Sequence, residues 1–307
     1  MSEWQDLIRL TQDKDCDVRW RAVEALGNAF SKMPDKTQAW QDLIRLTQDK
    51  EIGVRWGAVD VLGNAFSHVP DKTQAWQDLV RLTQDKEIGV RVGAVGALGN
   101  AFLQVPNKIQ AWEDLHRLTQ DKEIGVRRKA ADALGNAFSQ VPDKTQAWQD
   151  LHRLTQDKDW DVRRRAADAL SNAFSQVPDK IQAWQDLHRL TQDWDSGIKR
   201  RAADALGNAF SHVPDKTQAW QDLHRLTQDK DSDVRRGAAD ALGNAFSQAP
   251  DKTQAWQDLH KLTQDKDSDV RWKAEKVLGD AFSQAPDKTQ AWQDLIRLTQ
   301  DKEIGVR

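Results

Sequence analysis

One stretch of the chain decides its fold. Residues 35–70 read DKTQAWQDLIRLTQDKEIGVRWGAVDVLGNAFSHVP, and near copies of them follow one another along the 307 residues without an insertion. A tryptophan recurs at a fixed interval of 36 residues, at Trp4, Trp40, Trp76, Trp112, Trp148, Trp184, Trp220, Trp256 and Trp292. All eight prolines keep the same interval. Such regular repetition is typical of architectures in which one short structural unit is copied many times.

Each copy is predicted to form a helical hairpin. In residues 35–50 the apolar residues recur at helical spacing and would share one helix face: Ala39, Trp40, Leu43 and Leu46. Asp35 followed by Gln38 is a capping-box pattern, which marks the start of this first helix. A second apolar stripe follows a short acidic turn, with Val54, Ala58, Val61, Leu62 and Ala65. Pro70 ends the second helix soon after.

Two such helices cannot enclose a core alone, so each hairpin must bury its apolar face against the next one. The predicted fold is therefore all-α, an α-solenoid that forms a single domain over residues 1–307. Its repeats span about 1–34, 35–70, 71–106, 107–142, 143–178, 179–214, 215–250 and 251–286, with a partial ninth repeat at 287–307. Gly63 lowers helix propensity by ~1 kcal/mol relative to alanine, which indicates a close approach between helix backbones.

Residues 13–27 carry a pattern that recurs in eight units. It reads Asp13-x-Asp15-x-x-Val18-Arg19-x-x-Ala22-x-x-Ala25-Leu26-Gly27, with departures such as Lys199 for Arg and Ser171 for Gly. This pattern resembles the HEAT-like repeat named after the phycobilisome lyases. The resemblance implies a right-handed ARM/HEAT superhelix in which the second helix of each hairpin lines the concave surface. It implies no single function, because the family contains scaffolds, lyase subunits, hydroxylases and nucleic-acid binders.

Charge and cysteine content narrow the functional classes. Lys and Arg number 45 against 48 Asp and Glu, so no overall field attracts nucleic acid or anionic lipid. The single cysteine, Cys16, cannot form an intramolecular disulfide, and the N-terminus carries no apolar signal segment. No apolar run approaches the ~20 residues that would span a bilayer. These features predict a soluble, cytoplasmic protein.

The positions that differ between copies are predicted to carry the function. Three positions on the outward face of the second helix vary most. The first holds Trp20, Trp56, Val92, Arg128, Arg164, Arg200, Arg236 and Trp272. The second holds Arg21, Lys129, Arg165, Arg201 and Lys273, with glycine in the other copies, and the third holds Glu24, Asp60, Asp132, Asp168, Asp204 and Asp240 among others. We predict that these side chains form a partner-binding face, because outward Trp and Arg are enriched at interface hot spots.

A second interpretation of this face stays open. Arg128, Arg164, Arg200 and Arg236 each precede an aspartate by four residues, so i,i+4 ion pairs worth ~0.2 to 0.5 kcal/mol each would partly neutralise the face. The face would then be a solvated, self-paired helix surface. This alternative does not explain the outward positions of Trp20, Trp56 and Trp272.

Other polar residues are predicted to be structural. Asp13 and Arg19 recur along the repeats, with Lys199 replacing the arginine in one copy, as a ladder that fixes successive hairpins would. Five histidines, His116, His152, His188, His224 and His260, replace aliphatic residues of the first units and are expected at a half-buried helix flank. Packed helices lie ~8 to 10 Å apart, which makes a shared zinc site between neighbouring histidines improbable. We therefore predict no metal site, no cofactor and no catalytic residue.

The predicted function is a non-enzymatic scaffold for a protein or peptide that carries acidic residues and apolar anchors. Nucleic-acid binding is the main alternative, since Arg beside Trp suits phosphate contact and base stacking, but the interleaved aspartates argue against it. A sensor array within a larger regulatory protein is a further variant. Ile296 and Leu298 belong to a final helix that lacks a second helix beside it, which indicates either a fragment of a longer array or a surface for self-association.

Overall fold

The computed structural model describes the backbone of residues 3–300 and the side chains of residues 6–297. Within this range the chain is built from α-helices and short 3-10 turns, and it contains no strand. The odd-numbered helices are α1 (Glu3–Leu10), α3 (Lys36–Leu46), α5 (Lys72–Leu82), α7 (Lys108–Leu118), α9 (Lys144–Leu154), α11 (Lys180–Leu190), α13 (Lys216–Leu226), α15 (Lys252–Leu262) and α17 (Lys288–Gln300). The even-numbered helices are α2 (Cys16–Ala29), α4 (Ile52–Ala65), α6 (Ile88–Ala101), α8 (Ile124–Ala137), α10 (Trp160–Ala173), α12 (Ser196–Ala209), α14 (Ser232–Ala245) and α16 (Ser268–Ala281). The predicted solenoid of tandem helical hairpins is confirmed.

The helix ends follow from local chemistry. The Asp35 carboxylate accepts a hydrogen bond from the Gln38 backbone N–H at 2.9 Å and caps the start of α3, as the capping-box pattern predicts. Thr47 caps its end, and its hydroxyl donates to the Ile44 carbonyl. Each even-numbered helix runs into a 3-10 turn that begins with a phenylalanine, such as the buried Phe66 in Phe66–His68. Such a buried phenylalanine fixes the end of its helix in the core before the next repeat begins.

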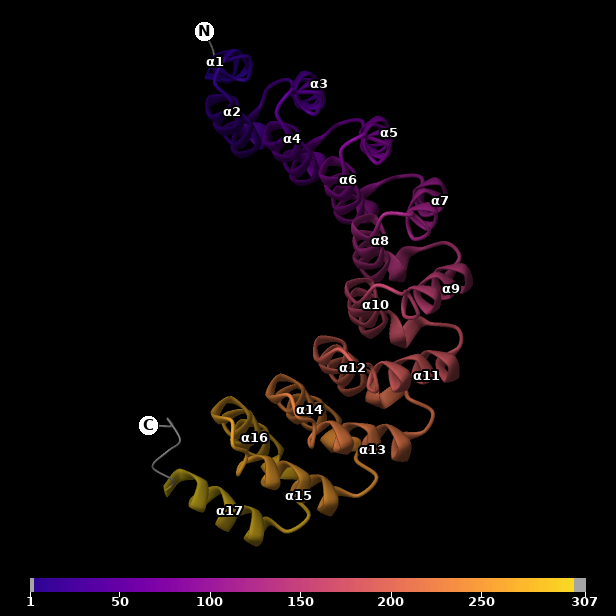
Figure 1. Cartoon of the computed structure of the whole chain (residues 1–307), viewed down its shortest axis with the longest axis vertical. Helices are drawn as coiled ribbons and strands as arrows, with labels where there is room; N and C mark the ends of the chain where they lie inside the picture. Colours follow the sequence, from indigo (N-terminus) through magenta and orange to yellow (C-terminus); the bar gives the residue numbers. More distant parts are fainter. Residues whose placement is uncertain (1–2, 301–307) are drawn as a thin grey trace. The chain divides into compact units, whose positions relative to one another are not determined.

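The chain divides into two compact units, Met1–Leu154 and Thr155–Arg307. In each unit the even-numbered helices pack side by side, and the odd-numbered helices form a second layer behind them (Figure 1). The layer of even-numbered helices consists of α2, α4, α6 and α8 in the first unit and of α10, α12, α14 and α16 in the second unit. The organisation of residues 1–307 as a single domain stays a prediction.

The core of each unit lies between these two layers. It contains fully buried leucine and phenylalanine side chains, among them Leu43, Leu62 and Phe66. Successive even-numbered helices approach closely at glycine, as expected from Gly63. A Cβ added at Gly63 would lie 3.0 Å from Ala97 Cβ, and one at Gly207 would lie 2.6 Å from Ala241 Cα. Over the described part of the chain, every helix is too short or too polar to cross a bilayer.

Candidate functional site

A ladder of buried arginines connects successive repeats. Arg19 donates from Nε and Nη2 to the carboxylate of Asp49, at 2.9 and 3.1 Å, and from Nη1 to the Asp13 and Lys14 carbonyls. Arg163 and Arg235 make the same contacts within the second unit. The hydrogen bonds that Arg235 donates to the Asp265 carboxylate raise the pKa of Arg235 above its ordinary value. The predicted structural role of these residues is thus confirmed.

The odd-numbered helices are joined by a second polar network. In the N-terminal repeats a buried tryptophan donates to an aspartate of the next repeat, as Trp76 Nε1 does to Asp114 at 2.9 Å. In the middle repeats histidine makes this contact, since His116 Nδ1 lies 2.6 Å from Asp150 and His188 Nδ1 lies 2.6 Å from Asp222. In the last described repeats tryptophan donates again, from Trp256 Nε1 to Asp294 at 3.2 Å. The histidines are half-buried, as predicted. Two further histidines also lie near buried carboxylates, with His224 Nδ1 3.0 Å from Asp258 and His260 Nδ1 3.9 Å from Asp294.

The predicted face lies on the even-numbered helices, and its aromatic members point outward. The exposed fractions are 47% for Trp20, 60% for Trp56 and 49% for Trp272. Arg21, Glu24 and Asp60 are exposed as well. The remaining predicted residues are half-buried: Val92, Arg128, Lys129, Asp132, Arg164, Arg165, Asp168, Arg200, Arg201, Asp204, Arg236, Asp240 and Lys273.

The charged part of the face pairs differently from the expected i,i+4 pattern. Arg164 turns back to Asp161, and Arg236 turns back to Asp233 at 2.7 Å. The prediction is wrong at these two arginines because helical side chains lean toward the helix N-terminus and reach the residue three positions earlier. The later aspartates pair with the next helix instead: Asp168 with Arg201 at 3.3 Å and Asp240 with Lys273 at 2.9 Å. In the second unit these pairs leave the face close to neutral.

Burial also changes two of the aspartates on this face. It raises the pKa of Asp168 and of Asp204 above the ordinary value, although Arg201 and Arg200 respectively oppose the shift. The side chain of Asp168 is 31% exposed, so solvent screens this effect. Both carboxylates belong to the neutralised part of the face.

Exposed isoleucines extend the face in a way that the sequence reasoning missed. Ile52, Ile88 and Ile124 begin α4, α6 and α8, and they are 52, 47 and 45% exposed. Each stands four residues before a predicted position, as Ile52 stands before Trp56, so both share one helix side. That spacing is the signal that could have found them. We call Trp20, Ile52, Trp56, Ile88, Val92 and Ile124 together the apolar face; it lies within the first unit.

Glycines shape this apolar face. A Cβ added at Gly57 would lie 3.6 Å from Trp20, and one at Gly93 would lie 3.5 Å from Trp56. Each indole therefore leans over a glycine of the next even-numbered helix and keeps its other side open to solvent. Beside Trp56 lies a pocket of about 390 Å³, with Gly93 and Gly96 of α6 in its lining and Arg128 and Lys129 of α8 at one edge. The face is hollowed where the side chains are smallest.

Further pockets lie elsewhere. One of about 440 Å³ in the second unit is lined by charged residues of the predicted face, including Arg200, Asp204, Arg236 and Asp240, with Trp272 at one wall. Two more lie between successive odd-numbered helices, α3 with α5 and α15 with α17. Their linings share equivalent positions of the repeat, such as Trp40 and Trp256 or Gln41 and Gln257. These two therefore follow from the repeat geometry and not from local variation.

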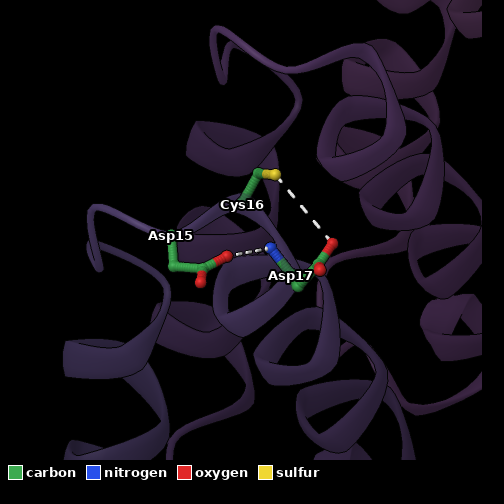
Figure 2. Close-up of side chains that lie close together, drawn as sticks. All are labelled: Asp15, Cys16 and Asp17. Carbon is green, nitrogen blue, oxygen red and sulfur yellow. Dashed lines mark hydrogen bonds between the residues drawn. The ribbon is translucent and has the colours of Figure 1, made fainter.

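One small cluster combines carboxylates with the only cysteine. Asp15, Cys16 and Asp17 are exposed at the start of α2, with their ligand atoms within 4.8 Å of one another (Figure 2). The Asp15 carboxylate accepts from the Asp17 backbone N–H at 2.8 Å, which is the bond of a helix N-cap. The same cap recurs at Asp231 and Asp267 without a cysteine. The cluster is explained by capping.

Solved structures share this fold. A structure of Kap95p with RanGDP gives a TM-score of 0.74 at 15% identity, over 98% of this chain and 45% of that chain. Importin beta gives a TM-score of 0.59 at 16% identity, over 96% of this chain and 42% of that chain. An engineered protein gives a TM-score of 0.53 at 24% identity, over 97% of this chain and 82% of that chain. The chain thus spans less than half of the Kap95p and importin beta chains. At these identities the likeness shows the fold alone.

Family models agree with the architecture. No curated protein matches the sequence. The model of HEAT repeats matches residues 186–279 and 225–307, and the model of the sister chromatid cohesion protein PDS5 matches residues 4–194. Together the two models reach from residue 4 to the end of the chain. With its tandem helical hairpins, the chain belongs to the family of HEAT-repeat proteins that these models describe.

Proposed function

We propose that this chain is a non-enzymatic scaffold that binds a protein or peptide through the outward side of its even-numbered helices. The apolar face carries the proposal. Large apolar side chains that are exposed side by side mark interaction sites, because water leaves them when a partner covers them. Trp20, Ile52 and Trp56 are each about half exposed and lie on neighbouring helices.

Two further observations support this assignment. The pocket beside Trp56 offers the concave, partly apolar site that receives an anchor side chain in many interfaces. Kap95p, whose structure with RanGDP has a similar fold, is a protein-binding member of this class of solenoids. The proposal assigns the same kind of activity to this chain, with the cytoplasm as its expected compartment.

Nucleic-acid binding has less support. Affinity for phosphate backbones requires cations that are free to neutralise phosphates. On the even-numbered helices of the second unit, Arg201, Arg236 and Lys273 are already paired with carboxylates. The self-association expected through α17 stays a prediction. Ile296 in that helix is 39% exposed, and the side chain of Leu298 lies outside the described residues.

The experiment compares capture of partners by three baits. The wild-type chain and a Trp20→Ala/Trp56→Ala variant are immobilised and exposed to extract of the source cells. A matched control, Ile109→Ala/Ile181→Ala, removes two exposed apolar side chains from the odd-numbered helices. The exposed fractions of these isoleucines are 63 and 59%. Circular dichroism and thermal melting verify that each bait is folded. A Trp272→Ala variant examines whether the second unit contributes.

We expect proteins that bind the wild type and the control to be lost from the tryptophan variant. Truncation of a hot-spot tryptophan costs about 2 kcal/mol, or about 30-fold in Kd for each site. Retention by the tryptophan variant, or equal loss from the control, would show that the partner binds elsewhere.

A further inference from the structure

Lys129 lacks the ion-pair partner that its counterparts have. Arg201 and Lys273 occupy the same position in later repeats, and each pairs with an aspartate of the preceding even-numbered helix, Asp168 or Asp240. In both cases the aspartate stands 33 residues earlier in the chain. For Lys129 that position is Gly96. Among the described side chains, no carboxylate forms an ion pair with the Lys129 ammonium.

The space of the missing aspartate is open. A Cβ added at Gly96 would meet nothing closer than Lys129 Cδ at 4.0 Å. This space belongs to the pocket of about 390 Å³ beside Trp56. The first unit therefore presents a half-buried cation next to a vacant position for a carboxylate, and an exposed indole borders the same cavity.

We propose that a bound peptide supplies this carboxylate, and that an adjacent apolar side chain of the peptide packs on Trp56. The inference rests on the proposed function and specifies its ligand. Lys129 of α8 lines one edge of the pocket, whereas Asp60 of α4 lines the pocket from the other side. This charge gradient orients the peptide with its acidic group toward α8.

The spacing of the two peptide groups follows from helix geometry. Trp56 leans over Gly93, and the Lys129 stem passes Gly96, so both contacts converge on α6. Positions three residues apart on a helix are ~5 to 6 Å apart. In an extended peptide, side chains two residues apart lie on the same side at ~6.6 Å. The expected ligand is therefore an apolar residue, any residue, and then aspartate or glutamate.

The counterpart lysine of the second unit is already paired. The equivalent position of its last even-numbered helix is Lys273, whose ammonium is held by Asp240 at 2.9 Å. Lys273 is therefore the matched control for Lys129, because it has the same residue type and the same place in the repeat but a partner within the chain.

The test uses fluorescein-labelled pentapeptides with both ends blocked. Leu, Ile, Phe or Trp stands at the second residue, and Glu, Asp, Gln, Asn or Lys stands at the fourth. A further series ends in a free carboxylate two residues after the apolar one, which distinguishes a side-chain carboxylate from a chain terminus. Fluorescence polarisation gives Kd values for the wild type and for Trp56→Ala, Gly96→Asp, Lys129→Glu and Lys273→Gln.

We expect the wild type to bind acidic peptides about 10-fold more tightly than their amide counterparts, as for a charge-assisted hydrogen bond. Gly96→Asp supplies an internal partner for Lys129 and should abolish this discrimination. Lys129→Glu should reverse it in favour of the Lys series, and Lys273→Gln should retain it. A higher melting temperature of Gly96→Asp, lost on adding Lys129→Gln, would verify the internal pair.

The outcomes separate this inference from the proposed function. If peptides bind and Trp56→Ala weakens them, but acid and amide peptides bind alike, the carboxylate site is refuted and the binding face stands. Equal loss of discrimination in Lys273→Gln also refutes the site. If no peptide in any series binds the wild type, both the carboxylate site and peptide binding by this face are wrong.

Discussion

Glycine has two different uses in this chain. At Gly207 it allows α12 and α14 to approach, because a Cβ there would lie 2.6 Å from the Ala241 Cα. At Gly279 in α16, a Cβ would meet no described atom within 4 Å. Glycine is therefore required by helix packing at Gly207, whereas at Gly279 it only lowers helix propensity.

This difference predicts opposite effects of one substitution. Gly207→Ala should lower the free energy of unfolding by about 1 to 3 kcal/mol, because the backbone of α14 must shift to relieve the overlap. Gly279→Ala should raise it by up to about 1 kcal/mol, through helix propensity alone. Urea unfolding followed by circular dichroism measures both values. Stabilisation by Gly207→Ala would show that the two helices are less closely packed than described.

At the scale of elements, the carboxylate in the turn before an even-numbered helix accepts a hydrogen bond from the preceding repeat, as Asp265 does from the buried Arg235 and Asp229 does from Lys199. Burial alone would raise the pKa of Asp265, but the hydrogen bonds from Arg235 and from the Asp267 backbone outweigh it and hold the pKa below its ordinary value. A similar bond from Lys199 lowers the pKa of Asp229. These contacts fasten successive repeats through the ends of α10 to α16.

The sign of these shifts predicts the response to acid. A carboxylate whose pKa is lower in the folded than in the unfolded state stabilises the fold at any pH above the unfolded pKa of about 3.9. This stabilisation is lost as the pH falls through the folded pKa. Asp265→Asn should lower the free energy of unfolding by about 3 to 5 kcal/mol at pH 6, since it leaves a buried arginine without its partner. We expect the difference from wild type to shrink below pH 4. Thermal melts from pH 6 to pH 2.5 measure it.

Asp204→Asn is the control for this prediction. Burial raises the pKa of Asp204, so ionisation of this carboxylate opposes folding, whereas ionisation of Asp265 favours it. Asparagine there should cause no comparable loss at pH 6. A constant difference between Asp265→Asn and wild type across the whole pH range would exclude the proposed linkage.

At the scale of the whole molecule, the helix contacts described within each unit join neighbouring repeats. Stability in such arrays is close to a sum of local terms, so damage stays local. Leu62→Ala in the core of the first unit should cost about 2 to 5 kcal/mol. Amide hydrogen exchange should become faster in α3 to α6 and stay unchanged in α13 to α16. Ile109→Ala, at an exposed site, should leave both regions unchanged; uniform acceleration would indicate that the chain unfolds as one unit.

The sequence alone determined the architecture, because its period is long and its apolar stripes match the helical repeat in every copy. It also separated structural residues, such as Arg19 and Trp76, from the variable positions that include Trp20 and Trp56. Only the tertiary structure decided which charges are neutralised, since Asp168 and Asp240 pair with a different helix from the one that carries them. The tertiary structure also revealed the exposed isoleucines of the apolar face and the open space at Gly96 beside Lys129. Both depend on side chains from neighbouring repeats that become adjacent only when the hairpins stack.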